Sequence, residues 1–149
     1  MKSKLILFFL ISFLFGNAYA NNLAAQQNLN KRIVVAFYNQ AVNKKDFAAA
    51  SHYLGPYYTQ HNPTAHDGAQ GLNQFIQFLQ DKYPNAHSEI KRVFAEGNFV
   101  ILHVHSIREP GTKGRAIFDL FRLEKSKIVE HWDTVQDIPE TAQNTNGMF

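Results

Sequence analysis

The sequence predicts an α+β domain in which helices come first and an antiparallel sheet follows. Up to Pro84 the apolar residues recur mainly at helical spacing, whereas beyond Pro84 they alternate with a period of two. The turns of the second half are short and hairpin-like, as at Gly97-Asn98 and Lys125-Ser126. This order predicts helices that cover one face of a curved sheet.

The first 20 residues have the pattern of a secretory signal peptide. Lys2 and Lys4 precede an apolar run from Leu5 to Phe15, and Ala18-Tyr19-Ala20 forms a small-x-small cleavage site. Because the run is short for a bilayer span, we expect cleavage after Ala20, no stable membrane anchor, and a mature chain in the periplasm or outside the cell. The chain has no cysteine, which excludes disulfides and thiol catalysis.

Removal of residues 1–20 leaves 129 residues, the size of one domain with its own core. We expect this domain to span 21–137 and to be followed by a flexible polar tail over 138–149. Without Lys2 and Lys4 the chain has 13 basic residues against 12 acidic ones. Since these charges are scattered, the sequence predicts no nucleic-acid surface and favours a small ligand as the partner.

Three helices are expected in the first half, each bounded by a recognisable cap or breaker. They cover 23–43, the segment from the cap Asp46 to about Tyr53, and the segment that follows Gly68 and Gly71 and ends at Pro84. A short strand is expected from Tyr57 to His61. In the second half the alternation predicts four strands, over 87–96, 99–108, 115–124 and 127–135.

Asp119 lies inside an apolar strand, where Ile117 and Phe121 share its face. An unpaired carboxylate costs several kcal/mol to bury, or takes up a proton instead. From the residues alone two explanations stay open: an ion pair with Arg115 or Arg122, or a functional acid that faces a cavity.

Two segments carry a resemblance to a known family: Gln60-His61-Asn62-Pro63, and the strand pair 117–123 and 127–133 with its Glu130-His131-Trp132-Asp133 run. The chain resembles the SnoaL-like polyketide cyclases, within the superfamily of nuclear transport factor 2, ketosteroid isomerase and limonene epoxide hydrolase. The resemblance implies a cone-shaped α+β barrel, with three helices packed on a strongly bent antiparallel sheet around an apolar cavity. It also implies that a homodimer can form.

The resemblance to ketosteroid isomerases implies a role for Asp119. Those enzymes have a similar strand whose aspartate stays protonated in an apolar site and donates a hydrogen bond to an oxyanion, a known property of that enzyme that is carried over here. The same alignment would turn Trp132 and Gln136 toward the cavity and Asp133 away from it. Asn62 lies near the position of the isomerase's general base, but an amide cannot accept the proton.

His61 is the candidate for the missing base, because imidazole titrates near neutral pH. SnoaL-like cyclases close rings by an aldol reaction without a cofactor, and we therefore expect His61 and Asp119 to act as a catalytic pair. His103 and His105 share a strand face, but no nearby acid completes a metal site, so no metal and no cofactor is expected. Ligand contacts are assigned to Asn62, His103, His105, Trp132 and Gln136.

Two functions remain open. The first is an exported enzyme that binds a small apolar carbonyl compound and performs aldol cyclisation, isomerisation or related acid/base chemistry. The second is a non-catalytic periplasmic binding or accessory module of the same fold. The amide at Asn62 and the export signal favour the second, and the fold alone cannot choose between them.

Overall fold

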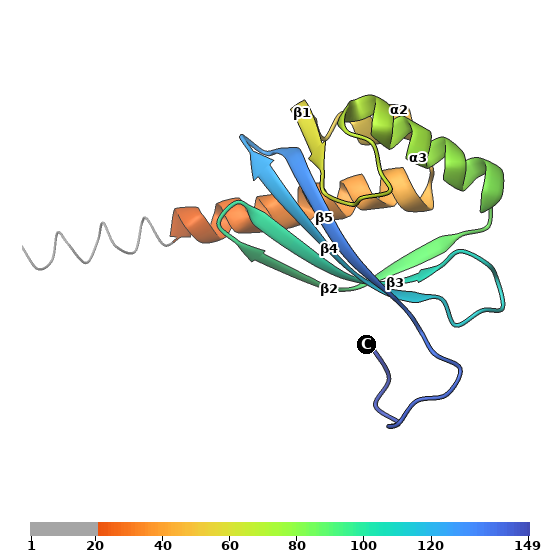
Figure 1. The fold of residues 1–149 in the computed structure, drawn as a ribbon. Helices are drawn as coiled ribbons and strands as arrows, with labels where there is room; N and C mark the ends of the chain where they lie inside the picture. Colours follow the sequence, from red (N-terminus) through yellow and green to blue (C-terminus); the bar gives the residue numbers. More distant parts are fainter. Residues whose placement is uncertain (1–20) are drawn as a thin grey trace, which may run out of the picture.

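A computed structural model describes residues 21–149, and the expected signal peptide lies outside the described residues. Residues 21–38 are helical and continue into the short π-helical segment η1, Asn39–Asn43. The other elements are two helices and five strands (Figure 1). Their bounds are α2 Phe47–Ser51, β1 Leu54–Gln60, α3 Gly68–Lys82, β2 His87–Glu96, β3 Phe99–Ile107, β4 Arg115–Glu124 and β5 Lys127–Asp137.

The helix boundaries follow local chemistry. Asp46 caps α2, because its side chain accepts a hydrogen bond from the backbone N–H of Ala49 at 2.9 Å. The expectation that Gly71 would precede α3 was wrong, since Gly71 lies inside the helix and is buried. A Cβ atom at Gly71 would lie 1.9 Å from the carbonyl oxygen of His66. Glycine is therefore needed there for close packing of the helix on the preceding loop.

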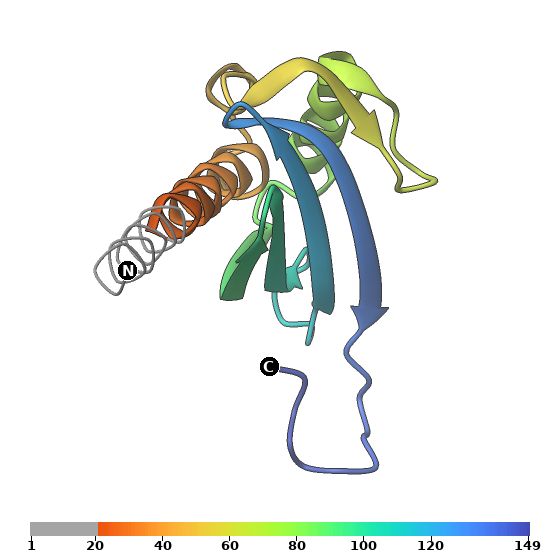
Figure 2. The same ribbon diagram turned by 90° about the vertical axis from the view of Figure 1, so that its left-hand side faces the viewer.

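The five strands form one sheet in the order β1-β5-β4-β3-β2. The four strands of the second half pair antiparallel, as the sequence predicts, but β1 pairs parallel to β5. The sheet is thus mixed rather than wholly antiparallel. It bends strongly, and the helices lie on one side of it (Figure 2). The expected arrangement of three helices on a bent sheet is confirmed.

The hydrophobic core lies between the helices and the sheet face that they cover, which we call the inner face. Val34 and Phe37 of the N-terminal helix pack with Leu102 of β3 and Phe121 of β4, all almost fully buried. The rings of Phe37 and Phe121 meet edge to face, with centroids 5.8 Å apart. Each fully buried side chain of this size stabilises the fold by about 1.5–3 kcal/mol.

A β-bulge interrupts the pairing of β4 with β5. Leu123 lies opposite Ile128, whereas the preceding residue, Arg122, lies opposite Glu130. Val129 is therefore an extra residue in β5, and it is buried together with Ile128. Beyond the bulge the odd-numbered residues of β5 face inward.

Residues 138–149 contain neither helix nor strand, and the chain turns back under the sheet (Figure 1). The ring of Phe149 lies 4.6 Å from that of His105. No helix within residues 21–149 is long and apolar enough to span a membrane.

Candidate functional site

A cavity of about 510 Å³ lies between the helices and the inner face of the sheet. Its wall is mainly apolar and aromatic, which suits a small organic ligand. Polar side chains from the N-terminal helix, from four strands and from the segments just after β1 and β3 also line it. They include Tyr38, Tyr58, Gln60, Asn62, Ser106, Arg108, Arg115, Asp119, His131 and Asp133.

Asp119 and His131 form a buried pair in this cavity. The Nε2 atom of His131 lies 3.1 Å from Oδ1 of Asp119, and its Nδ1 atom lies 2.7 Å from Oε1 of Gln60. The two residues are only 6 % and 8 % exposed. The sequence left open an ion pair between Asp119 and an arginine, and the structure does not contain such a pair within residues 21–149. The partner of Asp119 is a histidine on the neighbouring strand.

The hydrogen bonds indicate where the protons lie. Oε1 of Gln60 also accepts from the backbone N–H of Asn62 at 3.4 Å, so it acts as an acceptor for His131. Nδ1 of His131 therefore carries a hydrogen, and the contact between its Nε2 atom and Oδ1 of Asp119 needs a further proton between those two atoms. Burial raises the pKa of Asp119, although the hydrogen bond from His131 opposes this effect.

The second carboxyl oxygen of Asp119 has no hydrogen-bond partner within residues 21–149. Such a buried, unsatisfied oxygen costs free energy unless something pairs with it. Since Asp119 lines the cavity, a ligand is the group that can supply this partner. A protonated Asp119 can also donate a hydrogen bond there.

Asp133 is a second carboxylate on the inner face, directly opposite Asp119 in the pairing of β4 with β5. Nδ2 of Asn62 donates to both of its oxygens, at 2.8 and 2.9 Å. The amide of Asn62 is itself held by Thr64, whose backbone N–H and hydroxyl both donate to Oδ1. Asn62 thus fixes a carboxylate that keeps free lone pairs for a ligand proton.

Two tyrosine hydroxyls complete the polar part of the wall. Tyr38 and Tyr58 are 5 % and 4 % exposed and line the cavity. Burial, followed by the nearby charge of Asp119, raises the pKa of both hydroxyls well above the usual range. Both stay protonated at physiological pH and can act as hydrogen-bond donors.

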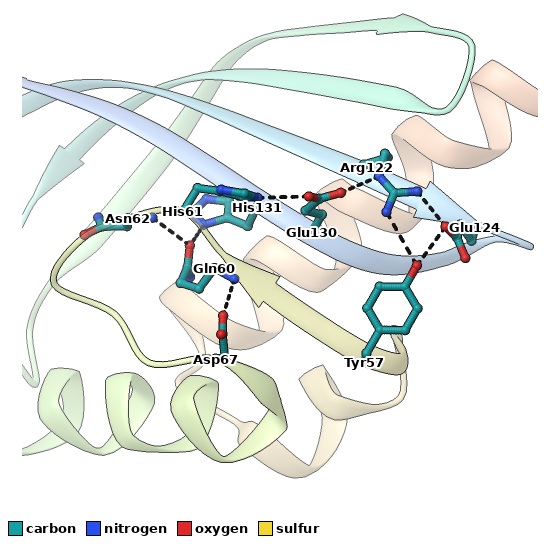
Figure 3. A network of polar contacts seen from close by, with 9 residues as sticks. All are labelled: Tyr57, Gln60, His61, Asn62, Asp67, Arg122, Glu124, Glu130 and His131. Atoms are coloured by element: carbon teal, nitrogen blue, oxygen red, sulfur yellow. Dashed lines mark hydrogen bonds and ion pairs between the residues drawn. The ribbon is translucent and has the colours of Figure 1, made fainter.

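The structure places His61 away from Asp119, contrary to expectation. Its Nε2 atom lies 2.9 Å from Oε1 of Glu130, and its ring stacks on Trp132 with centroids 4.3 Å apart. It is not part of the cavity wall. Glu130 continues through Arg122 to Glu124 and Tyr57 in a polar chain along the strands (Figure 3).

The sides expected for β5 are reversed. Trp132 and Gln136 lie on the outer face, whereas Asp133 lies in the cavity wall. The physical reason is the bulge at Val129: Ile128 faces inward, and in a regular strand the even-numbered residues after it would face inward as well. One extra residue exchanges the two faces for the rest of the strand.

His103 and His105 share a face, as expected, but it is the outer one. His103 stacks on Phe118 and its Nδ1 atom lies 3.1 Å from Arg92. Nε2 of His105 lies 2.8 Å from the carbonyl oxygen of Lys113. These positions give neither histidine a contact with the cavity. Of the expected ligand contacts, only Asn62 lies in the wall.

Sequence reasoning missed His131, Asp133 and Gln60. The signal that could have found them is the His131-x-Asp133 spacing, which puts two proton-transfer groups on one strand face.

Asp119, His131 and Asp133 also offer ligand atoms within 4.8 Å of one another. Within residues 21–149 these three side chains are of the right type and close enough together to hold a metal ion. The expected absence of a metal therefore stays a prediction.

The comparisons with known proteins agree with this architecture. The family model of the SnoaL-like domain matches residues 34–131. No curated protein matches the sequence.

Solved structures with the same fold include TsrD from Streptomyces laurentii, with 18 % identity over 73 % of this chain and 89 % of that one, at a TM-score of 0.61. A putative polyketide cyclase from Bacillus cereus is 18 % identical over 72 % and 74 % of the two chains, at a TM-score of 0.63. A limonene-epoxide-hydrolase-like epoxide hydrolase from M. tuberculosis is 19 % identical over 74 % and 85 %, at a TM-score of 0.60.

These likenesses, together with that to a nuclear transport factor 2-like protein from Cytophaga hutchinsonii, confirm the expected cone-shaped α+β fold. At these low identities the solved structures establish the fold only. The family match establishes the family, because it covers more than half of the sequence. The chain belongs to the SnoaL-like domain family.

Proposed function

We propose that this protein binds a small, largely apolar carbonyl compound in its cavity and removes a proton beside the carbonyl group. The observation that carries the proposal is the meeting of Asp119, His131 and Asp133 in one largely apolar cavity. Carbon acid chemistry needs a base for the proton and a donor for the enolate oxygen. This cavity offers both without a cofactor.

Asp133 is the base in this proposal. Asn62 holds its carboxylate from one side, and the remaining lone pairs are free toward the cavity. A base must be positioned before its proton affinity matters, and the fixed amide of Asn62 provides this positioning. His61 is not part of the proposed reaction, since it bonds to Glu130 on the other side of the sheet.

Asp119 and His131 are the acid in this proposal. With Nε2 of His131 donating to Oδ1, a proton on Oδ2 of Asp119 donates a hydrogen bond to the oxygen of the ligand as negative charge develops there. Tyr38 and Tyr58 lie close to Asp119 and provide further protonated hydroxyls. His131 positions the acid, because its Nε2 atom bonds to Oδ1 of Asp119 and its Nδ1 atom is held by Gln60.

The experiment follows deuterium exchange at the carbon beside the carbonyl of 2-tetralone, a small apolar ketone, by NMR in D₂O. We expect the wild-type protein to exchange this hydrogen faster than buffer alone. Asp133→Asn should slow the exchange while binding of the ketone persists. If 2-tetralone binds but is not exchanged above the buffer rate, the catalytic part fails and a non-catalytic binding module remains.

Export belongs to the same proposal and rests on the sequence. The charged start, the apolar run and the site after Ala20 support cleavage and delivery to the periplasm or the outside of the cell. Mass spectrometry of the mature protein from its own cells checks this. A mature chain that begins at Asn21 is the expected result, and an uncleaved chain in the cytoplasm would contradict it.

A homodimer through the outer face is the final part of the proposal. Phe94, Phe99, Ile101 and Phe118 are between 37 % and 54 % exposed on neighbouring positions of β2, β3 and β4. Such a patch marks an interaction surface. We expect a dimer by light scattering, and a monomer for Phe118→Glu. A wild-type monomer at all concentrations would contradict this.

A further inference from the structure

The end of the cavity away from Asp119 contains two arginines. Arg108 follows the last residue of β3, and Arg115 is the first residue of β4. Both line the cavity. Arg115 is four residues from Asp119 along β4, so the two ends are roughly 13 Å apart along the backbone at about 3.3 Å per residue. The cavity has acids at one end and cations at the other.

Arg108 has no anionic partner of its own. Within residues 21–149, no hydrogen bond or ion pair formed by its side chain is found, and its guanidinium packs instead against the rings of Phe78 and Tyr83, at 5.9 and 5.5 Å from their centroids. Burial lowers the pKa of Arg108 and the charge of Arg115 lowers it further, while Tyr83, Tyr38 and the charge of Asp133 have smaller opposing effects. A partly desolvated cation next to a like charge is unfavourable without an anion.

Arg115 is only partly neutralised. Its Nε atom lies 2.8 Å from Asp137, a residue whose side chain is 79 % exposed, and the other nitrogens of its guanidinium are not engaged by that contact. Opposite Arg115 in the sheet lies Ser106, whose hydroxyl accepts a hydrogen bond from Ser88 at 3.0 Å and keeps its own hydrogen for another acceptor. Three donors thus converge at this end of the cavity.

We propose that the arginine end of the cavity, formed by Arg108, Arg115 and Ser106, binds a carboxylate of the ligand, so that the ligand is an apolar ring compound with a carbonyl group at one end and a carboxylate at the other. Planar guanidinium groups match a carboxylate by paired hydrogen bonds. Phe78, one of the two rings that flank Arg108, also lines the cavity and suits a flat ring next to that carboxylate. The inference rests on the proposed function and specifies its substrate class.

The test compares 2-naphthoate with 2-acetylnaphthalene, which have the same ring and nearly the same shape but differ in charge. Isothermal titration calorimetry measures the affinity of each for the wild-type protein, Arg108→Gln, Arg108→Lys and Arg115→Gln. Arg32→Gln is the matched control, because Arg32 is an exposed residue of the N-terminal helix outside the cavity wall.

We expect the wild-type protein to bind 2-naphthoate about tenfold or more tightly than the ketone, and Arg108→Gln to abolish this preference without weakening ketone binding. Arg108→Lys should keep part of it, Arg115→Gln should reduce it, and Arg32→Gln should leave it unchanged. Circular dichroism confirms that each variant is folded.

Equal affinities of the wild-type protein for the two compounds would overturn the carboxylate site and leave the proposed carbonyl-binding function standing. A preference that persists in Arg108→Gln, or that Arg32→Gln removes equally, would overturn it too, because general attraction to a basic protein would then explain the result. If neither compound binds, the proposed function itself fails.

Discussion

The two faces of strands β4 and β5 each contain residues that are unusual for their side of a sheet. The inner face buries Asp119 and His131, whereas the outer face exposes Phe118 to 50 %. Burying polar groups costs free energy unless they are paired, and exposing a large ring gives up the free energy of its burial. The proposed function accounts for the buried acid and histidine of the inner face, and the proposed dimer accounts for the exposed ring of the outer face.

The largest effect is expected from the charge on the inner face. Asp133→Asn should slow deuterium exchange of 2-tetralone by about 10²–10⁴-fold, the contribution typical of a positioned general base. The replacement keeps the shape and leaves Asn62 in place, so binding should change little. Rates and affinities by NMR check this, and loss of binding together with the rate would point to a structural role for Asp133 instead.

Packing on the two faces can be compared with two phenylalanines of β4. Phe121 is 2 % exposed and Phe118 is 50 % exposed. Phe121→Ala should lower the free energy of unfolding by about 3–5 kcal/mol, because it leaves a cavity in the core.

Phe118→Ala is the matched control and should cost less than about 1 kcal/mol in dilute protein. Urea unfolding at several protein concentrations measures both. A cost for Phe118→Ala that grows with concentration would sharpen the comparison, since it would identify the outer face as buried in an assembly. Equal costs in dilute protein would break the distinction between the faces.

The acid on the inner face should make stability depend on pH. Since burial raises the pKa of Asp119, the unfolded chain loses this proton at lower pH than the folded protein does. Its contribution is therefore fully present below the unfolded pKa and is lost as pH rises through the folded pKa.

Asp119→Asn removes this dependence, so we expect the variant to gain stability relative to the wild type between pH 4 and pH 8. Thermal or urea unfolding at both values provides the measurement. A difference between the two proteins that does not change with pH, or that falls, would show that His131 holds Asp119 as a carboxylate in the folded protein.

The smallest effect is expected on the other side of the sheet, at His61. His61→Ala removes one partly exposed pair with Glu130 and a stacking contact with Trp132. Such pairs contribute about 0–1 kcal/mol, and the exchange of 2-tetralone should change less than twofold. The same NMR assay checks this, and a large loss of exchange would return His61 to the reaction.

The sequence predicted the fold well where signals are local. The hairpin turns at Gly97-Asn98 and Lys125-Ser126 and the cap at Asp46 act within a few residues, and the elements bounded by them lie where expected. The parallel pairing of β1 with β5 was not predicted, because contacts such as that between Thr59 and Glu130 join distant parts of the chain and leave no local pattern.

The site was predicted only in part, for the same reason. Asp119 is conspicuous in its own strand, since a carboxylate among apolar neighbours needs an explanation. Its partner His131 is not, because that pairing depends on the register of two strands and on a bulge that no glycine or proline marks. Arg108 was also missed, since its lack of a partner is a property of the folded molecule.

The extra residue in β5 has a consequence for how this protein can change. A deletion of Val129 would remove one residue from a strand buried in the core, yet it would act at a distance along the chain by turning every later side chain over. Trp132 and Thr134 would then face the ligand, and His131 and Asp133 would face outward. The single residue Val129 thus decides whether the strand presents the acid of Asp133 or the indole of Trp132 to the cavity. A family member that lacks this extra residue would need a different chemistry in the same cavity.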